Sequence, residues 1–107
     1  MKLAMEKICV IYVTSSSRKE AEDISHVLLN EKLAVCVNIL GEIDSIFWWD
    51  NKLVSEKEIG FLVKTSLSKA DAVISRVKEV HSYECPCIIK LGVDGGDPEF
   101  LKWVVGK

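Results

Sequence analysis

The sequence predicts an α+β domain in which two helices pack against one face of an antiparallel sheet, and two kinds of pattern lead to this fold class. Short apolar runs rich in β-branched residues, the first of them residues 8–13, are typical of buried strands. Other segments carry apolar residues at helical spacing. The segments follow one another in the order β-α-β-β-α-β-α. The first six elements fit the ferredoxin-like split βαβ arrangement, and we expect residues 1–107 to form one domain.

Residues 8–31 are expected to form the first strand and the first helix. Residues 8–13 are apolar without interruption, which predicts a strand buried on both faces. Ser17 and Glu20 then fit a capping box, in which side chains satisfy the free N–H groups of the first helical turn. The apolar side of the helix behind them is made of Ala21, Ile24, Val27 and Leu28.

Residues 33–65 are expected to contain the second and third strands, with a long β-hairpin from about residue 44 to residue 65. Residues 33–40 are an apolar run that Gly41 closes, and residues 44–49 are rich in aromatic side chains. Asp50 and Asn51 both tolerate a positive φ, so they fit a two-residue turn before the returning strand of residues 52–65. This hairpin is longer than the sheet of such a small domain needs, and a protruding two-stranded ribbon is only marginally stable alone in water.

The rest of the chain predicts a second helix, a fourth strand and a short third helix. Residues 68–71 are a weaker capping signal for the second helix, whose apolar stripe is Ala70, Val73, Ile74, Val77 and Val80. Pro86 ends any helix, and residues 87–93 are typical of a strand. Asp97 before Pro98 predicts a capped helix start with proline at its first position.

Composition and charge exclude several classes of protein. Hydrophobic residues make up 49% and charged residues 28% of the chain, which is the balance of a folded rather than a disordered protein. The net charge is −2, and Lys and Arg are scattered among Asp and Glu, which argues against a nucleic-acid partner. The longest apolar run is far shorter than the roughly 20 residues of a membrane span, and the first residues do not resemble a signal peptide. We therefore expect a cytoplasmic protein with reduced cysteines and no membrane partner.

The sequence contains no pattern for an enzyme active site. Nucleophilic catalysis needs a Ser or Cys beside a His and an orienting acid, but the only histidines are His26 and His81. The sequences G-x-S-x-G, C-x-x-C and H-E-x-x-H do not occur, and Gly95-Gly96 fits a turn rather than a phosphate loop. We predict that the protein is not an enzyme, and an unrecognised hydrolase or transferase ranks last among the functions considered.

Several short segments stand in a fixed order along residues 8–104 and carry a resemblance to a known family. They are Tyr12-Val13-Thr14, Leu33-Ala34-Val35-Cys36-Val37-Asn38-Ile39, Ser45-Ile46-Phe47-Trp48-Trp49, Glu58 with Lys64-Thr65, His81-Ser82-Tyr83-Glu84-Cys85-Pro86, and Phe100-Leu101-Lys102-Trp103. Together they resemble the CutA (divalent cation tolerance) family. The resemblance implies a ferredoxin-like subunit assembled as a cytosolic homotrimer, in which long hairpins extend the sheets of neighbouring subunits. It also implies an architecture similar to PII-type signalling proteins and a link to copper tolerance.

Trp48 and Trp49 stand side by side near the turn of the predicted hairpin. Neighbouring strand residues point to opposite faces, so the two rings cannot both face one core. Exposed strand edges and exposed aromatic rings are a liability unless another chain covers them. We predict that at least one of the two lies in a trimer interface, and the alternative is that both pack on their own subunit.

Cys85 and Cys87 are candidate metal ligands, together with His81. In an extended segment residues i and i+2 point to the same side, and Pro86 holds its neighbours extended. Two thiolates on one face suit a soft ion such as Cu(I), with a further ligand supplied by another group or a neighbouring subunit. The alternatives are packed or merely exposed thiols. The resembling family usually carries an acidic residue at the position of Cys87.

His81 follows the second predicted helix, where it would interact with the negative end of the helix dipole. The resemblance also implies a cation site at this position. In the family that proposed site includes a cysteine before the strand-one threonine and a second histidine before His81, and here those positions hold Val13 and Val80.

Glu58, Lys64 and Tyr83 are polar residues at otherwise apolar strands. They fit a hydrogen-bonded cluster at a subunit junction, because buried charges are usually paired, or a cleft for a small anionic ligand of the kind that PII-type proteins have. Two functions follow. The first is divalent-cation (copper) tolerance, in which a cytosolic trimer binds copper or another heavy metal ion. The alternative is a PII-like trimeric small-molecule sensor or interaction scaffold without a physiological metal site.

Overall fold

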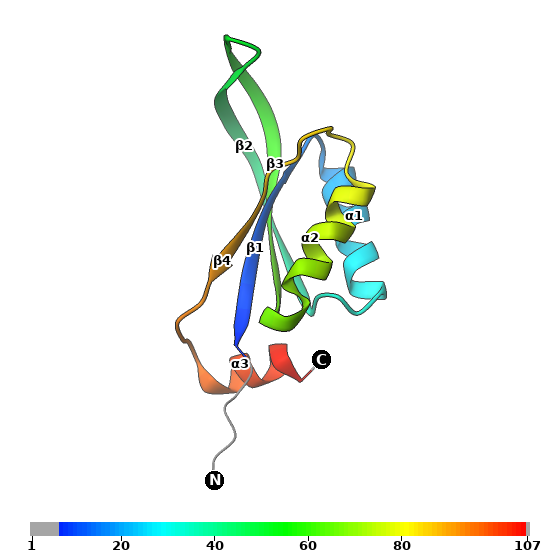
Figure 1. Cartoon of the computed structure of the whole chain (residues 1–107), viewed down its shortest axis with the longest axis vertical. Coiled ribbons are helices and arrows are strands. Elements are labelled where there is room, and N and C mark those ends of the chain that lie inside the picture. Colours follow the sequence, from blue (N-terminus) through cyan, green and yellow to red (C-terminus); the bar gives the residue numbers. More distant parts are fainter. Residues whose placement is uncertain (1–6, 107) are drawn as a thin grey trace.

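The computed structural model describes residues 7–106 and shows a four-stranded antiparallel sheet covered by helices. The elements in chain order are β1 (Ile8–Ser15), α1 (Arg18–Asn30), β2 (Cys36–Trp49), β3 (Lys52–Ser66), α2 (Ala70–Val80), β4 (Ile88–Gly92) and α3 (Pro98–Val105). The strands lie in the order β2-β3-β1-β4, so each helical connection crosses one intervening strand. Figure 1 shows α1 and α2 on one face of the sheet and α3 at one end of it. The predicted α+β fold and the order of its elements are confirmed.

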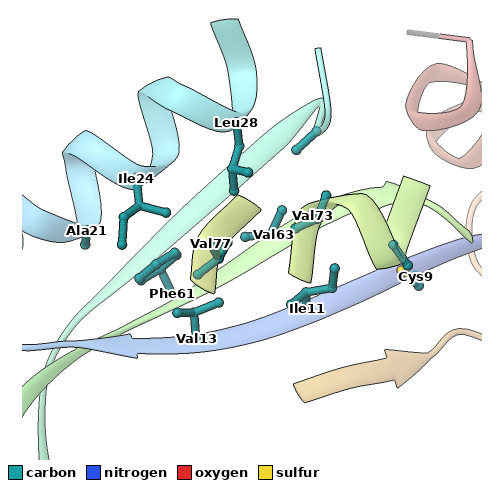
Figure 2. Close-up of a cluster of buried hydrophobic side chains, with 12 residues drawn as sticks. Cys9, Ile11, Val13, Ala21, Ile24, Leu28, Phe61, Val63, Val73 and Val77 are labelled. Atoms are coloured by element: carbon teal, nitrogen blue, oxygen red, sulfur yellow. The ribbon is translucent and has the colours of Figure 1, made fainter. Parts of the chain in front are cut away.

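The core lies between the sheet and the two long helices. Cys9, Ile11 and Val13 alternate along β1 and are fully buried, because side chains at every second strand position point to the helical side. Phe61 and Val63 of β3 lie beside them, and Figure 2 shows these side chains pointing at α1 and α2. The helices contribute their apolar stripes: Ala21, Ile24 and Leu28 from α1, with Val73 and Val77 from α2.

The other face of the sheet has no such cover over most of its length. Val10 and Tyr12 of β1 are only half-buried, so the prediction that this strand is buried on both faces is wrong for the single chain. Ile89 and Leu91, their partners on β4, are 49% and 45% exposed. The reason is that both long helices lie on the same side of the sheet (Figure 1). None of the helices within residues 7–106 is long and apolar enough to cross a membrane.

Two of the three predicted helix starts are confirmed. The Ser17 hydroxyl accepts a hydrogen bond from the Glu20 backbone N–H at 3.1 Å, although the Glu20 carboxylate returns to the N–H of Ser16 rather than of Ser17. Asp97 caps α3 in the same way, with proline in the first turn. The signal at residues 68–71 is wrong in detail, because a 3-10 turn over Leu67–Lys69 precedes α2 and the N-cap position falls on Lys69.

The β2–β3 hairpin is the longest feature of the molecule. Asp50 and Asn51 have φ angles of 51° and 61°, which confirms the predicted two-residue turn. The hairpin extends well beyond the helices, and the chain measures 56 × 26 × 22 Å (Figure 1). A β-bulge interrupts the pairing with β3 between Ile39 and Gly41, and Gly41 has a φ of 102° that favours glycine.

Candidate functional site

A cleft lies where the hairpin leaves the sheet. Its volume is about 620 Å³, which is in the range of small-molecule sites. The lining residues come from β1, β2, β3 and the segment that leads into β4, and they are Tyr12, Thr14, Ser45, Phe47, Trp49, Val54, Glu56, Glu58, Tyr83, Glu84, Cys85 and Cys87. Three separate parts of the chain, which are β1, the β2–β3 hairpin and the segment before β4, therefore line one cleft.

The bulge at Gly41 decides which side chains of β2 face the cleft. Before the bulge, Val37 and Ile39 pack against the core on the helical side. After it, Phe47 and Trp49 line the cleft on the opposite side of the ribbon, although their positions are also odd-numbered. One extra residue in a strand exchanges its two faces, because side chains alternate with a period of two.

Glu58 and Tyr83 are the polar pair of the cleft. Glu58 is only 7% exposed, and the Tyr83 hydroxyl donates a hydrogen bond of 2.9 Å to its Oε2. Burial and the bond to Glu58 raise the pKa of the Tyr83 hydroxyl well above its usual value. Burial also raises the pKa of Tyr12, and the charges of Cys87 and Glu58 add to this shift. The charge of Glu58 therefore acts on both tyrosines of the cleft.

His81 positions Tyr83 from behind the cleft. Its Nε2 lies 2.7 Å from the Thr14 carbonyl oxygen and its Nδ1 lies 3.0 Å from the Tyr83 backbone N–H. A carbonyl only accepts and an N–H only donates, so these bonds assign the neutral tautomer with the proton on Nε2. His81 is buried and is not among the residues that line the cleft. To bind an ion through Nδ1 it would have to release Tyr83.

Glu20 holds the same turn from the helix side. Its Oε2 accepts a hydrogen bond of 2.7 Å from the Ser82 backbone N–H and lies 3.8 Å from Nδ1 of His81. Burial on its own would raise the pKa of Glu20, but the hydrogen bonds from Ser82 and Ser16 outweigh it and the pKa is lowered. The carboxylate therefore stays charged and ties α1 to the segment that carries Tyr83.

Cys85 and Cys87 both line the cleft. Cys85 is exposed and Cys87 is half-buried. Burial raises the pKa of the Cys87 thiol, a hydrogen bond with Thr14 lowers it, and the charge of Glu58 raises it, with a net increase. Within residues 7–106, no three His, Cys, Asp or Glu side chains are grouped closely enough to hold a metal ion.

Lys64 lies apart from Glu58 and Tyr83. It pairs with Val10 of β1, and its ammonium group lies 5.3 Å from the centre of the Phe100 ring of α3. Glu58 is six positions earlier on the same strand, so the two side chains lie on the same face but about 20 Å apart along it. The predicted cluster of Glu58, Lys64 and Tyr83 is therefore present in one chain only as the Glu58–Tyr83 pair.

Trp48 and Trp49 point to opposite faces of the ribbon, as predicted. Trp49 is 57% exposed and lines the cleft, whereas Trp48 is 72% exposed beside its cross-strand partner Leu53. Neither ring is buried by its own chain. Sequence reasoning missed Phe47 and Glu56 as cleft residues, although their alternation with Trp49 and Glu58 is a signal once the Asp50-Asn51 turn is fixed.

Comparison with known proteins decides the family. The CutA1 divalent ion tolerance protein family matches residues 9–107. The chain belongs to this family. A relative from Archaeoglobus fulgidus, named divalent-cation tolerance protein CutA, is 45% identical over 94 residues, which span 88% of this chain and 91% of that protein. A CutA homolog from Xenopus laevis is 41% identical over 87% of this chain and 62% of its own length.

Solved structures of CutA proteins share the fold of this chain. The structure described as the periplasmic divalent cation tolerance protein CutA from Archaeoglobus fulgidus has a TM-score of 0.88 at 43% identity, and the match covers 91% of this chain and 94% of that one. The resemblance in six ordered segments was therefore a correct guide to the family.

Proposed function

We propose that this CutA protein acts in divalent-cation tolerance by binding copper or another heavy metal ion, as a cytoplasmic homotrimer and not as an enzyme. The names of its relatives support the general role. The observation that carries the metal proposal is the position of Cys85 and Cys87, whose side chains line one cleft next to Glu58. Two sulfur ligands on one wall suit Cu(I) better than a harder ion.

The two thiols would be the primary ligands. A cysteine binds a metal as the thiolate, so binding displaces a proton, and the raised pKa of Cys87 makes this displacement harder at neutral pH. The affinity should therefore increase as the pH rises toward and beyond the usual thiol value of about 8.5. His81 would add a ligand only after giving up its hydrogen bond from Tyr83. A third ligand from a neighbouring subunit would complete the site.

The trimer is supported by apolar surface that one chain leaves exposed. The hairpin carries Ile46, Trp48 and Leu53 with exposed fractions of 69%, 72% and 64%, and the open face of the sheet adds Ile89 and Leu91. Monomeric proteins rarely leave such a series of large apolar side chains in water. A second and a third copy of the chain would cover both regions.

A competition titration with a Cu(I) chelator at two pH values tests the metal proposal. We expect the Cys85→Ser/Cys87→Ser double variant to lose most of the affinity, and the wild-type affinity to be higher at the higher pH. Cys36→Ser is the matched control, because Cys36 is half-buried on β2 and does not line the cleft. Full affinity in the double variant would show that the thiolate site is wrong.

A second candidate function is a small-molecule sensor. The specific observation that favours it is the cleft itself, in which the buried Glu58–Tyr83 pair is already formed inside a volume of about 620 Å³. A sensor ligand would contact this pair and the aromatic wall rather than the thiols. The Cys85→Ser/Cys87→Ser variant separates the two functions, because ligand binding would survive in it and Cu(I) binding would not.

A further inference from the structure

The charges around the cleft determine which kind of small molecule it suits. Its lining includes the carboxylates of Glu56, Glu58 and Glu84 and contains no Lys, Arg or His. Lys64, the residue that would have favoured an anion, lies beside α3 instead. An anionic ligand would therefore meet three carboxylates and no cationic side chain of this subunit. The cleft suits a cation, whereas the sequence led to the alternative of a small anionic ligand.

Glu58 is the buried one of these three carboxylates, whereas Glu56 and Glu84 are exposed. Burying a carboxylate is costly unless a cation or several donors compensate it, and the Tyr83 hydroxyl that donates to Glu58 is neutral. None of the ion pairs formed within residues 7–106 includes Glu58. Its negative charge also contributes to the raised pKa values of Tyr12, Tyr83 and Cys87. A positive group in the cleft would relieve this cost.

The walls of the cleft are aromatic. Tyr12, Phe47, Trp49 and Tyr83 come from three different parts of the chain and line the same cleft as Glu58, with Tyr83 bonded to the carboxylate and Phe47 and Trp49 farther along the hairpin. A Cβ at Gly60, two positions from Glu58, would lie 3.4 Å from the Tyr12 ring, so this ring lies against the same part of β3 as Glu58. Aromatic faces attract cations, and aromatic-lined sites with a nearby carboxylate suit alkylated ammonium groups, which carry both a charge and an apolar shell.

We propose that the cleft binds a small organic cation, an alkylated or quaternary ammonium compound, with its charge at Glu58 and its apolar groups against the nearby rings of Tyr12 and Tyr83. This inference rests on the second candidate function, the small-molecule sensor. A bare metal ion would use neither the aromatic walls nor most of the volume of the cleft. The thiols of Cys85 and Cys87 are not needed for this ligand.

Calorimetric titration of the intact wild-type protein with three small probes tests the proposal. The probes are choline, its neutral isostere 3,3-dimethylbutan-1-ol, and the dianion succinate. We expect choline to bind about tenfold more tightly than the neutral isostere, and succinate not to bind, because only choline combines the charge with the apolar shell. The Cys85→Ser/Cys87→Ser variant should bind choline as the wild type does.

Substitutions of the carboxylates locate the ligand. Glu58→Gln keeps the size of the side chain and its hydrogen bond with Tyr83 but removes the charge, so choline affinity should fall about tenfold or more. Glu84→Gln is a second, exposed substitution on the same cleft that does not disturb the core, and it should also weaken choline. Glu22→Gln on α1 is the matched control, because it removes one negative charge elsewhere and should leave the affinity unchanged.

Three results would overturn the inference, and they differ in whether the proposed sensor function also fails. Preferential binding of succinate would retain the sensor function but reverse the sign of its ligand. Equal binding of choline and its neutral isostere would leave an apolar cleft without charge selection. If no probe binds and Glu58→Gln weakens the assembly instead, a side chain of a neighbouring subunit fills the cleft, and the sensor function fails as well.

Discussion

The two faces of the sheet differ in how completely one chain can bury them. On the helical face, β1 and β3 present Ile11, Val13 and Phe61 to α1 and α2 with no exposed surface. On the other face and along the hairpin, side chains of the same chemical type stay half-exposed or exposed. Both regions have the strand pattern of apolar residues, so the pattern alone does not tell an intramolecular core from a surface that needs a partner or a ligand.

The largest expected effect is on the helical face. Phe61→Ala should lower the free energy of unfolding by about 3–5 kcal/mol, because it leaves a cavity among fully buried neighbours. Leu62→Ala, one position along on the other face, should cost clearly less in the dissociated chain, because Leu62 is only half-buried. Urea unfolding at equal, low protein concentration measures both. Equal losses would mean that the two faces are equally packed within one chain.

The next effect is on assembly. Sedimentation should show a trimer at micromolar concentration, and at least one of the variants Trp48→Ala and Trp49→Ala should weaken it, since truncating a buried aromatic side chain costs about 3–5 kcal/mol. The reason is that both rings are exposed in one chain and gain burial only from a neighbour. Leu29→Ala on α1, 36% exposed on the helical side, is the control. A stable wild-type monomer would defeat the trimer proposal.

A smaller effect is expected in the cleft. Tyr83→Phe removes the donor to buried Glu58 and should cost about 1–3 kcal/mol. The pH dependence adds a second readout. Because the pKa of Tyr83 is raised in the folded protein, its contribution is complete below the usual tyrosine value of about 10 and decreases as the pH rises above it. The variant should lose that part of the decrease, and an unchanged alkaline slope would contradict the pairing.

The smallest effect concerns the bulge that exchanges the faces of β2. Gly41→Ala should cost about 1–2 kcal/mol, because a φ of 102° is unfavourable for a residue with a Cβ, even though open space surrounds this position. Gly92→Ala on β4 is the matched control, since it also has open space and no positive φ. Thermal unfolding of the two variants compares them, and equal midpoints would mean that the backbone angle at Gly41 is not strained by a side chain.

Local rules were enough to predict much of the fold. The apolar run of β1, the helical stripes, the Asp50-Asn51 turn and the caps at Ser17 and Asp97 each depend on residues a few positions apart. The weaker cap at residues 68–71 was misplaced because a 3-10 turn, and not the helix, follows β3. The ordered segments also led to the correct family, since their spacing is a property of the sequence alone.

Periodicity, turn propensity and capping act over short distances, so the sequence alone predicts the elements, their order and the family. It also predicts that Cys85 and Cys87 lie on one side. Only the tertiary structure decided that Glu58 meets Tyr83 and not Lys64, and that Phe47 faces the cleft. The physical reason is register: a single bulge at Gly41 exchanges the faces of a strand, and distances along a strand grow by about 3.3 Å per residue. Which side chains share a site is therefore set by pairing between distant segments.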